Sequence, residues 1–149
     1  MIYPIFSDEY FMNEALKEAQ KAFELEEVPV GAVVVNQNRI IGRAHNMTQQ
    51  LNDVTAHAEM IAITSASNFL GAKYLIDCTL FVTLEPCLMC ASALKWAQLD
   101  RLVFAASDPR EGFSRLDHQV LHKKTEVLPG ILEEQASSLL TRFFLKRRS

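Results

Sequence analysis

The sequence lacks the features that mark secreted, membrane-spanning and polycationic proteins. It contains only three cysteines in 149 residues, which argues against a disulfide scaffold and for a reducing compartment, by default the cytoplasm. No apolar run approaches the about 20 residues that a membrane-spanning helix needs, and residues 1–6 lack the basic and long apolar regions of a signal peptide. The net charge of -3 excludes a polycation that coats nucleic acid, so any contact with nucleic acid must be local.

The length and composition are typical of one compact domain. At 149 residues and 49% hydrophobic content, the chain can form a sizeable core, and we find no internal repeat, low-complexity tract or linker. We therefore expect a single domain over residues 1–149.

The pattern of apolar residues predicts alternating helices and strands. We expect the first helix to begin at Ser7-Asp8 and end near Glu26, and a second to begin with Thr55 as its N-cap. A third should begin with Pro86 at its first position, where the missing N–H costs nothing. Strands are expected at 28–35, 40–42, 79–84, 102–106 and 125–128. Residues 107–124 should form a loop with at most one short helical turn. The last helix is expected at 131–146, and its buried face can be formed by Leu132, Leu139, Leu140, Phe143 and Phe144. This order predicts a three-layer α/β/α domain around a mixed, largely parallel five-stranded sheet.

Two short stretches, His57-Ala58-Glu59 and Pro86-Cys87-Leu88-Met89-Cys90, carry the residue types of a zinc site. A structural zinc site usually closes its tetrahedron with four protein ligands, whereas a catalytic site keeps three and leaves a position for water. The candidate ligands here are three, His57, Cys87 and Cys90. The positive end of a helix dipole at Cys87 would favour both thiolates.

Glu59 is a candidate proton shuttle beside the metal. Residues two apart on a regular helix point in nearly opposite directions, so Glu59 and His57 cannot share one helical face. If His57 lies in an irregular first turn, both side chains can approach one metal ion. A carboxylate that does not ligate the metal would then transfer protons to and from activated water.

Simpler interpretations exist for each residue taken alone. A single histidine is more often an ordinary core or surface residue, and a single Cys-x-x-Cys can be a redox pair. The combination of His-x-Glu with Pro-Cys-x-x-Cys is far more specific, because it is the signature of zinc-dependent base deaminases. Cys78, without an obvious partner, is expected to be a small buried residue at a strand entrance.

The same stretches, together with Val28-Pro29-Val30-Gly31-Ala32-Val33 and Asn46, closely resemble bacterial tRNA-specific adenosine deaminases, which have the cytidine deaminase-like fold. The similarity extends to the Phe143-Phe144 pair and covers nearly the whole chain. It implies one Zn²⁺ ion per chain, held by the residues named above, and Glu59 as the proton shuttle. It also implies adenosine-to-inosine conversion at the wobble position of a tRNA anticodon loop, usually by a homodimer.

The resemblance also suggests residues that bind the substrate. Asn46, which by pattern alone is an ordinary loop residue, would hydrogen-bond the base, and Asp108 would contact the ribose, where a 2′-hydroxyl distinguishes RNA from DNA. Further base contacts are expected from the apolar wall formed by Val28, Pro29 and Val30 and from the backbone at Ala58 and Pro86.

One region departs from the family pattern. Relatives usually have a loop rich in Gly, Ala and Ser after the position of Asp108, whereas this chain has Asp108-Pro109-Arg110-Glu111-Gly112-Phe113-Ser114-Arg115 and a shorter connection. The basic residues Lys146-Arg147-Arg148, with Lys123 and Lys124, are candidates for phosphate contacts or simply a solvated charged surface.

Three functions remain open on the sequence. The first is deamination of adenosine in RNA, the second is deamination of a free base or nucleoside such as guanine or cytosine, and the third is a non-catalytic zinc or RNA-binding module.

Overall fold

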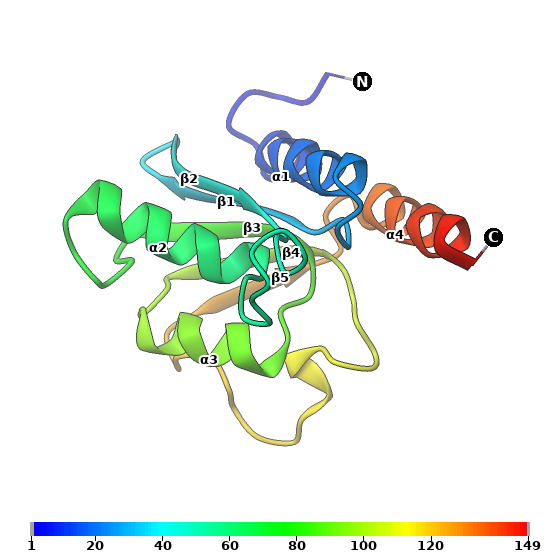
Figure 1. The fold of residues 1–149 in the computed structure, drawn as a ribbon. Helices are drawn as coiled ribbons and strands as arrows, with labels where there is room; N and C mark the ends of the chain where they lie inside the picture. The colour runs from blue at the N-terminus through cyan, green and yellow to red at the C-terminus, as the bar shows by residue number, and fades with distance from the viewer. Residues whose placement is uncertain (1, 149) are drawn as a thin grey trace.

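The protein folds around one five-stranded β-sheet with the strand order β2-β1-β3-β4-β5 (Figure 1). The structure, a computed structural model, describes residues 2–148, and the side chain of Arg148 lies outside the described part. The strands are β1 (Gly31–Asn36), β2 (Arg39–His45), β3 (Cys78–Leu84), β4 (Arg101–Ala106) and β5 (Glu126–Pro129). The helices are α1 (Asp8–Glu24), α2 (Ala58–Leu70), α3 (Leu88–Trp96) and α4 (Glu133–Arg148), with a 3-10 turn η1 at Phe113–Arg115.

The strand directions confirm the mixed, largely parallel sheet. β1 pairs antiparallel with both β2 and β3, whereas β3, β4 and β5 pair in parallel. Within residues 2–148, β1 alone therefore runs against the other four strands. The carboxyl ends of β3 and β4 consequently meet at the same edge of the sheet, where ligand sites of α/β proteins form.

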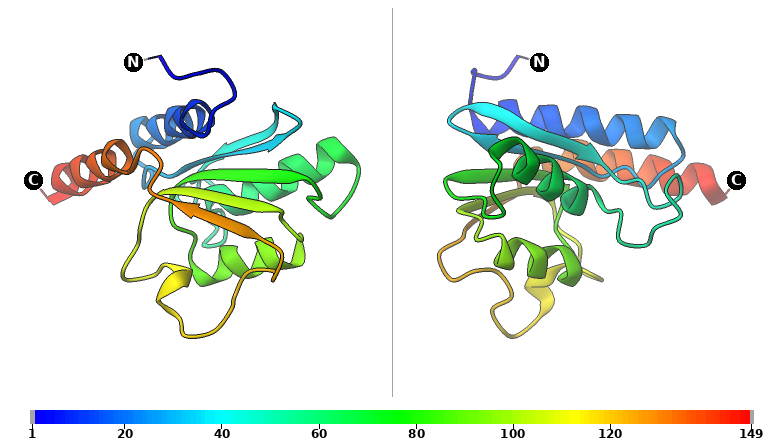
Figure 2. Two further views of the ribbon diagram at one scale, coloured as in Figure 1. Left: turned by 180° about the vertical axis from the view of Figure 1, so that it is seen from behind. Right: turned by 60° about the vertical axis from the view of Figure 1, so that its left-hand side comes forward.

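Helices cover both faces of the sheet, which confirms the predicted three-layer arrangement. Helices α1 and α4 lie on one face, and α2 and α3 lie on the other (Figures 1 and 2). Alternate residues of β1 point into the two cores: Val33 and Val35 pack toward α1, whereas Ala32 and Val34 pack on the α2 side.

The first strand begins later than the sequence suggests. Residues 28–30 were expected to open the strand, but β1 begins at Gly31. Pro29 has no N–H to offer a ladder, and the N–H of Val30 donates to the carbonyl of Val28 at 2.8 Å in a tight turn. Gly31 is required here, because a Cβ atom would overlap the α1 backbone at Ala15 and Ala19.

Both site-bearing helices also begin later than expected. Thr55 is not the N-cap of α2: its N–H and hydroxyl both donate to Oδ1 of Asp53, and His57 takes the N-cap position. Pro86 is not the first residue of α3, since Cys87 is the N-cap and α3 begins at Leu88. The backbone at Pro86 and Cys87 instead pairs with the 112–113 segment, including a hydrogen bond from Phe113 N–H to Pro86 O of 3.0 Å.

The outer helices differ from expectation only in detail. Helix α1 has Ser7 as its N-cap, as predicted, but ends at Glu24. Leu139 and Phe143 of α4 are buried, whereas Phe144 is 45% exposed, because α4 packs on the sheet through Ala136 instead. The basic end of α4 contacts aromatic rings: Lys146 lies over Phe23, and Arg147 lies over Phe143.

Within residues 2–148, no helix is both long enough and apolar enough to cross a membrane.

Candidate active site

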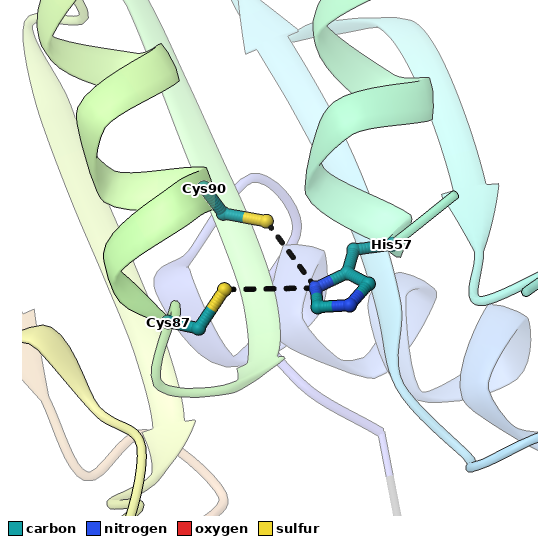
Figure 3. A group of neighbouring side chains, drawn as sticks. All are labelled: His57, Cys87 and Cys90. Atoms are coloured by element: carbon teal, nitrogen blue, oxygen red, sulfur yellow. Dashed lines mark hydrogen bonds between the residues drawn. The ribbon is translucent and has the colours of Figure 1, made fainter. Parts of the chain in front are cut away.

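The three candidate metal ligands converge between the first residues of α2 and α3 (Figure 3). His57 and Cys87 are the N-cap residues of the two helices, and Cys90 lies in the first turn of α3. Nδ1 of His57 lies 3.6 Å from Sγ of Cys87 and 3.5 Å from Sγ of Cys90. Within residues 2–148, these side chains form a group whose ligand atoms all lie within 4.8 Å of one another.

These separations match the dimensions of a zinc site. A Zn–N bond of about 2.0 Å and a Zn–S bond of about 2.3 Å at the tetrahedral angle place nitrogen and sulfur about 3.5 Å apart. Sulfur and imidazole nitrogen are ligands that suit zinc, whereas magnesium and calcium prefer oxygen ligands. His57, Cys87 and Cys90 are therefore positioned to bind one zinc ion, with a fourth position left for a small molecule.

The surroundings shift the pKa values of the two thiols of the site in opposite directions. Hydrogen bonding from Cys90, followed by that from His57, lowers the pKa of Cys87 to about 4. The same hydrogen bond to Cys87, together with burial, raises the pKa of Cys90. The hydrogen bond to Cys87 likewise raises the pKa of His57. One sulfur is thus a thiolate near neutral pH, which is the form that ligates a metal.

Glu59 lies in the first turn of α2 and is 4% exposed. His57 has an extended backbone (φ -71°, ψ 153°), so it stands outside the helical spacing that would separate the two side chains. Burial raises the pKa of Glu59 to about 7, against the opposing influence of its own backbone N–H and of His57. A carboxyl group with such a pKa can both accept and release a proton near neutral pH.

A cavity of about 480 Å³ opens beside these groups. Five of the substrate-binding residues expected from the sequence line it, whereas Pro29 and Pro86 are buried and are not among the lining residues. The lining comprises Val28, Val30, Asn46, Thr48, His57, Ala58, Glu59, Leu84, Glu85, Cys87, Asp108 and Glu111. Its volume lies within the range of about 300–1,000 Å³ that is usual for small-molecule sites.

The polar side chains of the cavity wall are held by nearby backbone groups. The amide of Asn46 donates to Val28 O and accepts from Thr48 N–H, both at 3.3 Å. Oδ1 of Asp108 accepts from the N–H groups of Arg110 and Glu111, both at 3.1 Å. Both side chains therefore have fixed orientations at the cavity wall.

Two buried carboxylates near the cavity were not foreseen. Glu27 is fully buried and accepts from the N–H groups of Gln49 and Gln50. Glu85 is 3% exposed and accepts from Asp108 and Ser114. The sequence gives one signal for them, since each carboxylate directly precedes a predicted site residue, Val28 or Pro86.

Comparison with known proteins assigns the chain to a family. Residues 6–106 match the model of the cytidine and deoxycytidylate deaminase zinc-binding region. The chain is 47% identical over 146 residues to the tRNA-specific adenosine deaminase of Aquifex aeolicus, an alignment that covers 95% of this chain and 96% of that protein.

Solved structures agree with this assignment. One, from studies of A-to-I editing by tRNA:A34 deaminases at the wobble position of transfer RNA, has a TM-score of 0.83 and 42% identity, and the match covers 88% of this chain and 99% of that one. The guanine deaminase of Bacillus subtilis is more distant, with a TM-score of 0.65 and 38% identity over 68% of this chain and 65% of that one. The zinc-ligand geometry, the fold and these similarities together show that the chain belongs to the tRNA-specific adenosine deaminases, within the zinc-dependent cytidine and deoxycytidylate deaminase family.

Proposed function

We propose that this protein is a zinc-dependent hydrolase that converts adenosine to inosine in tRNA, at the wobble position of the anticodon loop. The observation that carries the proposal is that Glu59, His57 and Cys87 line one cavity, and that Cys90 completes the metal group behind them. The similarity to tRNA-specific adenosine deaminases over 95% of the chain supports the choice of substrate.

Bound zinc supplies Lewis acidity that activates a water molecule near neutral pH. Glu59 takes a proton from this water while the water oxygen attacks C6 of the adenine. Glu59 delivers that proton to N1 of the ring. C6 then becomes tetrahedral. Glu59 next moves the hydroxyl proton to the amino group, the C6–N bond breaks, ammonia leaves, and a carbonyl forms at C6. The pKa of Glu59 near 7 suits both transfers.

The cavity wall orients the base. We assign Asn46 to the edge of the adenine, with Val28 and Val30 providing apolar contacts and the backbone at Ala58 guiding the attacked ring. We assign Oδ2 of Asp108 to the ribose 2′-hydroxyl, because the N–H groups of Arg110 and Glu111 both donate to Oδ1. An unstacked base is needed, since an adenine inside a duplex cannot reach the site.

Exposed apolar side chains and free thiols bear on the oligomeric state and the compartment of the protein. We propose a homodimer, supported by the exposed apolar side chains of α3, where Trp96 is 76% exposed and Leu88 is 45% exposed. The free thiols of Cys87 and Cys90 suit the reducing conditions of the cytoplasm.

The test is to incubate the zinc-loaded protein with an anticodon stem-loop RNA that carries adenosine at the wobble position, and to measure inosine and ammonia. The matched control RNA carries guanosine there, and parallel reactions contain free guanine, cytosine and adenosine. We expect inosine only from the adenosine stem-loop. Product only from a free base would replace the proposal with a base deaminase such as the guanine enzyme, and no product from any substrate would favour a binding module.

A further inference from the structure

Glu85 is a buried carboxylate whose hydrogen bonds go to a distant loop. It stands between the end of β3 and the N-cap of α3, two residues before Cys87, and only 3% of it is exposed. A buried charge is costly unless hydrogen bonds or an opposite charge compensate it. The carboxylate accepts three hydrogen bonds, one from Asp108 and two from Ser114.

The carboxylate joins the two ends of the 108–114 segment. Oε1 of Glu85 accepts from the N–H of Asp108 at 3.0 Å. Oε2 accepts from the N–H of Ser114 at 2.8 Å and from its hydroxyl at 2.6 Å. Hydrogen bonds to an ionised acceptor are stronger than those between neutral groups, so these bonds fix the path of the segment more firmly than backbone pairing alone.

The middle of the segment packs closely against the same turn. Gly112 donates from its N–H to Asp108 O at 2.9 Å and forms a β-bridge with Cys87. A Cβ atom at Gly112 would overlap both the Glu85 carboxyl group and the Asp108 carbonyl oxygen. The fit of the segment on the Cys87 turn therefore depends on a glycine at this position.

The segment carries two acidic side chains to the cavity. Asp108 and Glu111 both line it, and Oδ1 of Asp108 is already occupied by the N–H groups of residues 110 and 111. Any movement of the segment away from Glu85 would displace these side chains together. The zinc ligands and Glu59 lie at the beginnings of α2 and α3, outside the segment.

We propose that Glu85 is a positioning residue for substrate recognition, which holds the 108–114 segment on the Cys87 turn and thereby sets the location of Asp108 and Glu111 in the cavity wall. The effect on the substrate rests on the proposed function, whereas the holding of the segment does not. Loss of the interaction is therefore expected to raise KM while kcat and zinc content stay close to those of the unmodified protein.

Two variants disturb this contact from opposite sides. Glu85→Gln keeps one acceptor but turns an amide N–H group toward the donors of the segment, and Gly112→Ala pushes the segment away while Glu85 stays unchanged. Glu18→Gln is the matched control, because Glu18 is equally buried at 3% exposure but pairs with Arg43 and Lys21 on the other face of the sheet.

Hydrogen exchange measured by mass spectrometry reports the segment directly, without any need for catalysis. Exchange in peptides that contain the amides of Asp108 and Ser114 should be faster by about tenfold or more in Glu85→Gln and Gly112→Ala, the factor expected for one hydrogen bond to a charged group. The control Glu18→Gln should leave this exchange unchanged. Unchanged exchange in both test variants, or an equal increase in the control, would overturn the proposal.

Kinetics on the stem-loop RNA then test the effect on the substrate. KM should rise about tenfold in both variants, with kcat within about threefold, and the effects of the double variant should be less than additive because both act on one segment. A fall in kcat at constant KM, or loss of zinc by elemental analysis, would instead place Glu85 in the metal chemistry and overturn the proposal. If the unmodified protein does not act on RNA, the proposed function fails, while the exchange result still decides whether Glu85 holds the segment.

Discussion

At the scale of single residues, the site depends on His57 and Cys87 standing at helix beginnings. As N-cap residues they have extended backbones, so their side chains are free of the helical spacing that governs the residues after them. This places His57 toward the two sulfurs while Glu59, two residues later, reaches the same cavity from the first turn of α2. A ligand and a proton carrier can therefore come from one tripeptide.

Replacement of Glu59 separates metal binding from catalysis. We expect Glu59→Gln to retain one zinc per chain and to lose about 10²–10⁴-fold in kcat, the usual contribution of a positioned acid or base. Zinc is measured by elemental analysis, and turnover by inosine formation in the stem-loop RNA. Loss of zinc in this variant would show that Glu59 is a ligand.

Replacement of Cys87 should have the opposite effect. Serine is a poor zinc ligand at neutral pH, so Cys87→Ser should weaken zinc binding about 100-fold or more. Mutation of a residue that is only hydrogen-bonded to a ligand already lowers metal affinity by about 10–100-fold. Competition with a metal-sensitive dye measures the affinity. Cys78→Ser is the matched control, because Cys78 is a buried thiol in β3 and no part of the metal group. Equal affinities in the two variants would contradict the ligand assignment.

At the scale of elements, α1 is tied to β2 by a group of ion pairs. Arg43 of β2 binds Glu14 at 2.9 Å and Glu18 at 2.8 Å, and Lys21 also binds Glu18 at 2.8 Å. Burial opposes the ionisation of Glu18, but hydrogen bonds and charge interactions with Lys21 and Arg43 outweigh it and lower the pKa of this carboxyl below 4.5. The pairs hold the edge strand β2 against the helix that covers it.

The stability of this contact should depend on pH. Because the folded-state pKa of Glu18 is depressed, its contribution is present above the unfolded value of 4.5 and is lost as the pH falls through the folded value. Glu18→Gln should therefore lower the free energy of unfolding at pH 7 by about 1–2 kcal/mol, since Lys21 and Arg43 remain partly solvated. The difference should shrink below pH 4.5. Urea unfolding at several pH values measures it, with Glu24→Gln, an exposed residue of the same helix, as the control; a pH-independent difference would contradict this account.

The elements also show what sequence patterns can and cannot predict. The strands, the helix order and the three-layer arrangement followed from apolar periodicity and turn residues. The starts of β1 and α2 did not, because local hydrogen bonds of Val30 and Thr55 delay them. The start of α3 did not either, because it is set by a tertiary contact, the pairing of Pro86 and Cys87 with the 112–113 segment. Glu85 escaped notice for the same reason, since its partners at 108 and 114 are distant in the chain. The candidate zinc ligands could be predicted because the spacing of His57, Cys87 and Cys90 in the sequence is itself typical of a zinc site.

At the scale of the whole molecule, the metal group links α2 and α3 across one face of the sheet. A ligand that binds the folded state alone stabilises it by mass action, and at 1,000 times its dissociation constant the gain is about 4 kcal/mol. Removal of zinc by a chelator should therefore lower the Tm by roughly 8–16 °C for a chain of this size. Differential scanning calorimetry measures the shift. Cys87→Ser serves as the control with little response to chelator, and an unchanged Tm of the unmodified protein would show that the ion does not contribute to folding stability.

The position of β3 has a consequence for how the protein is made. His57 precedes this strand and Cys87 follows it, and β3 lies in the middle of the sheet between β1 and β4. A nascent polypeptide that has emerged only as far as His57 carries one of the three ligands. All three are present together only after β3 and Cys90 have been translated, so the complete metal site can form only once the centre of the sheet has been made.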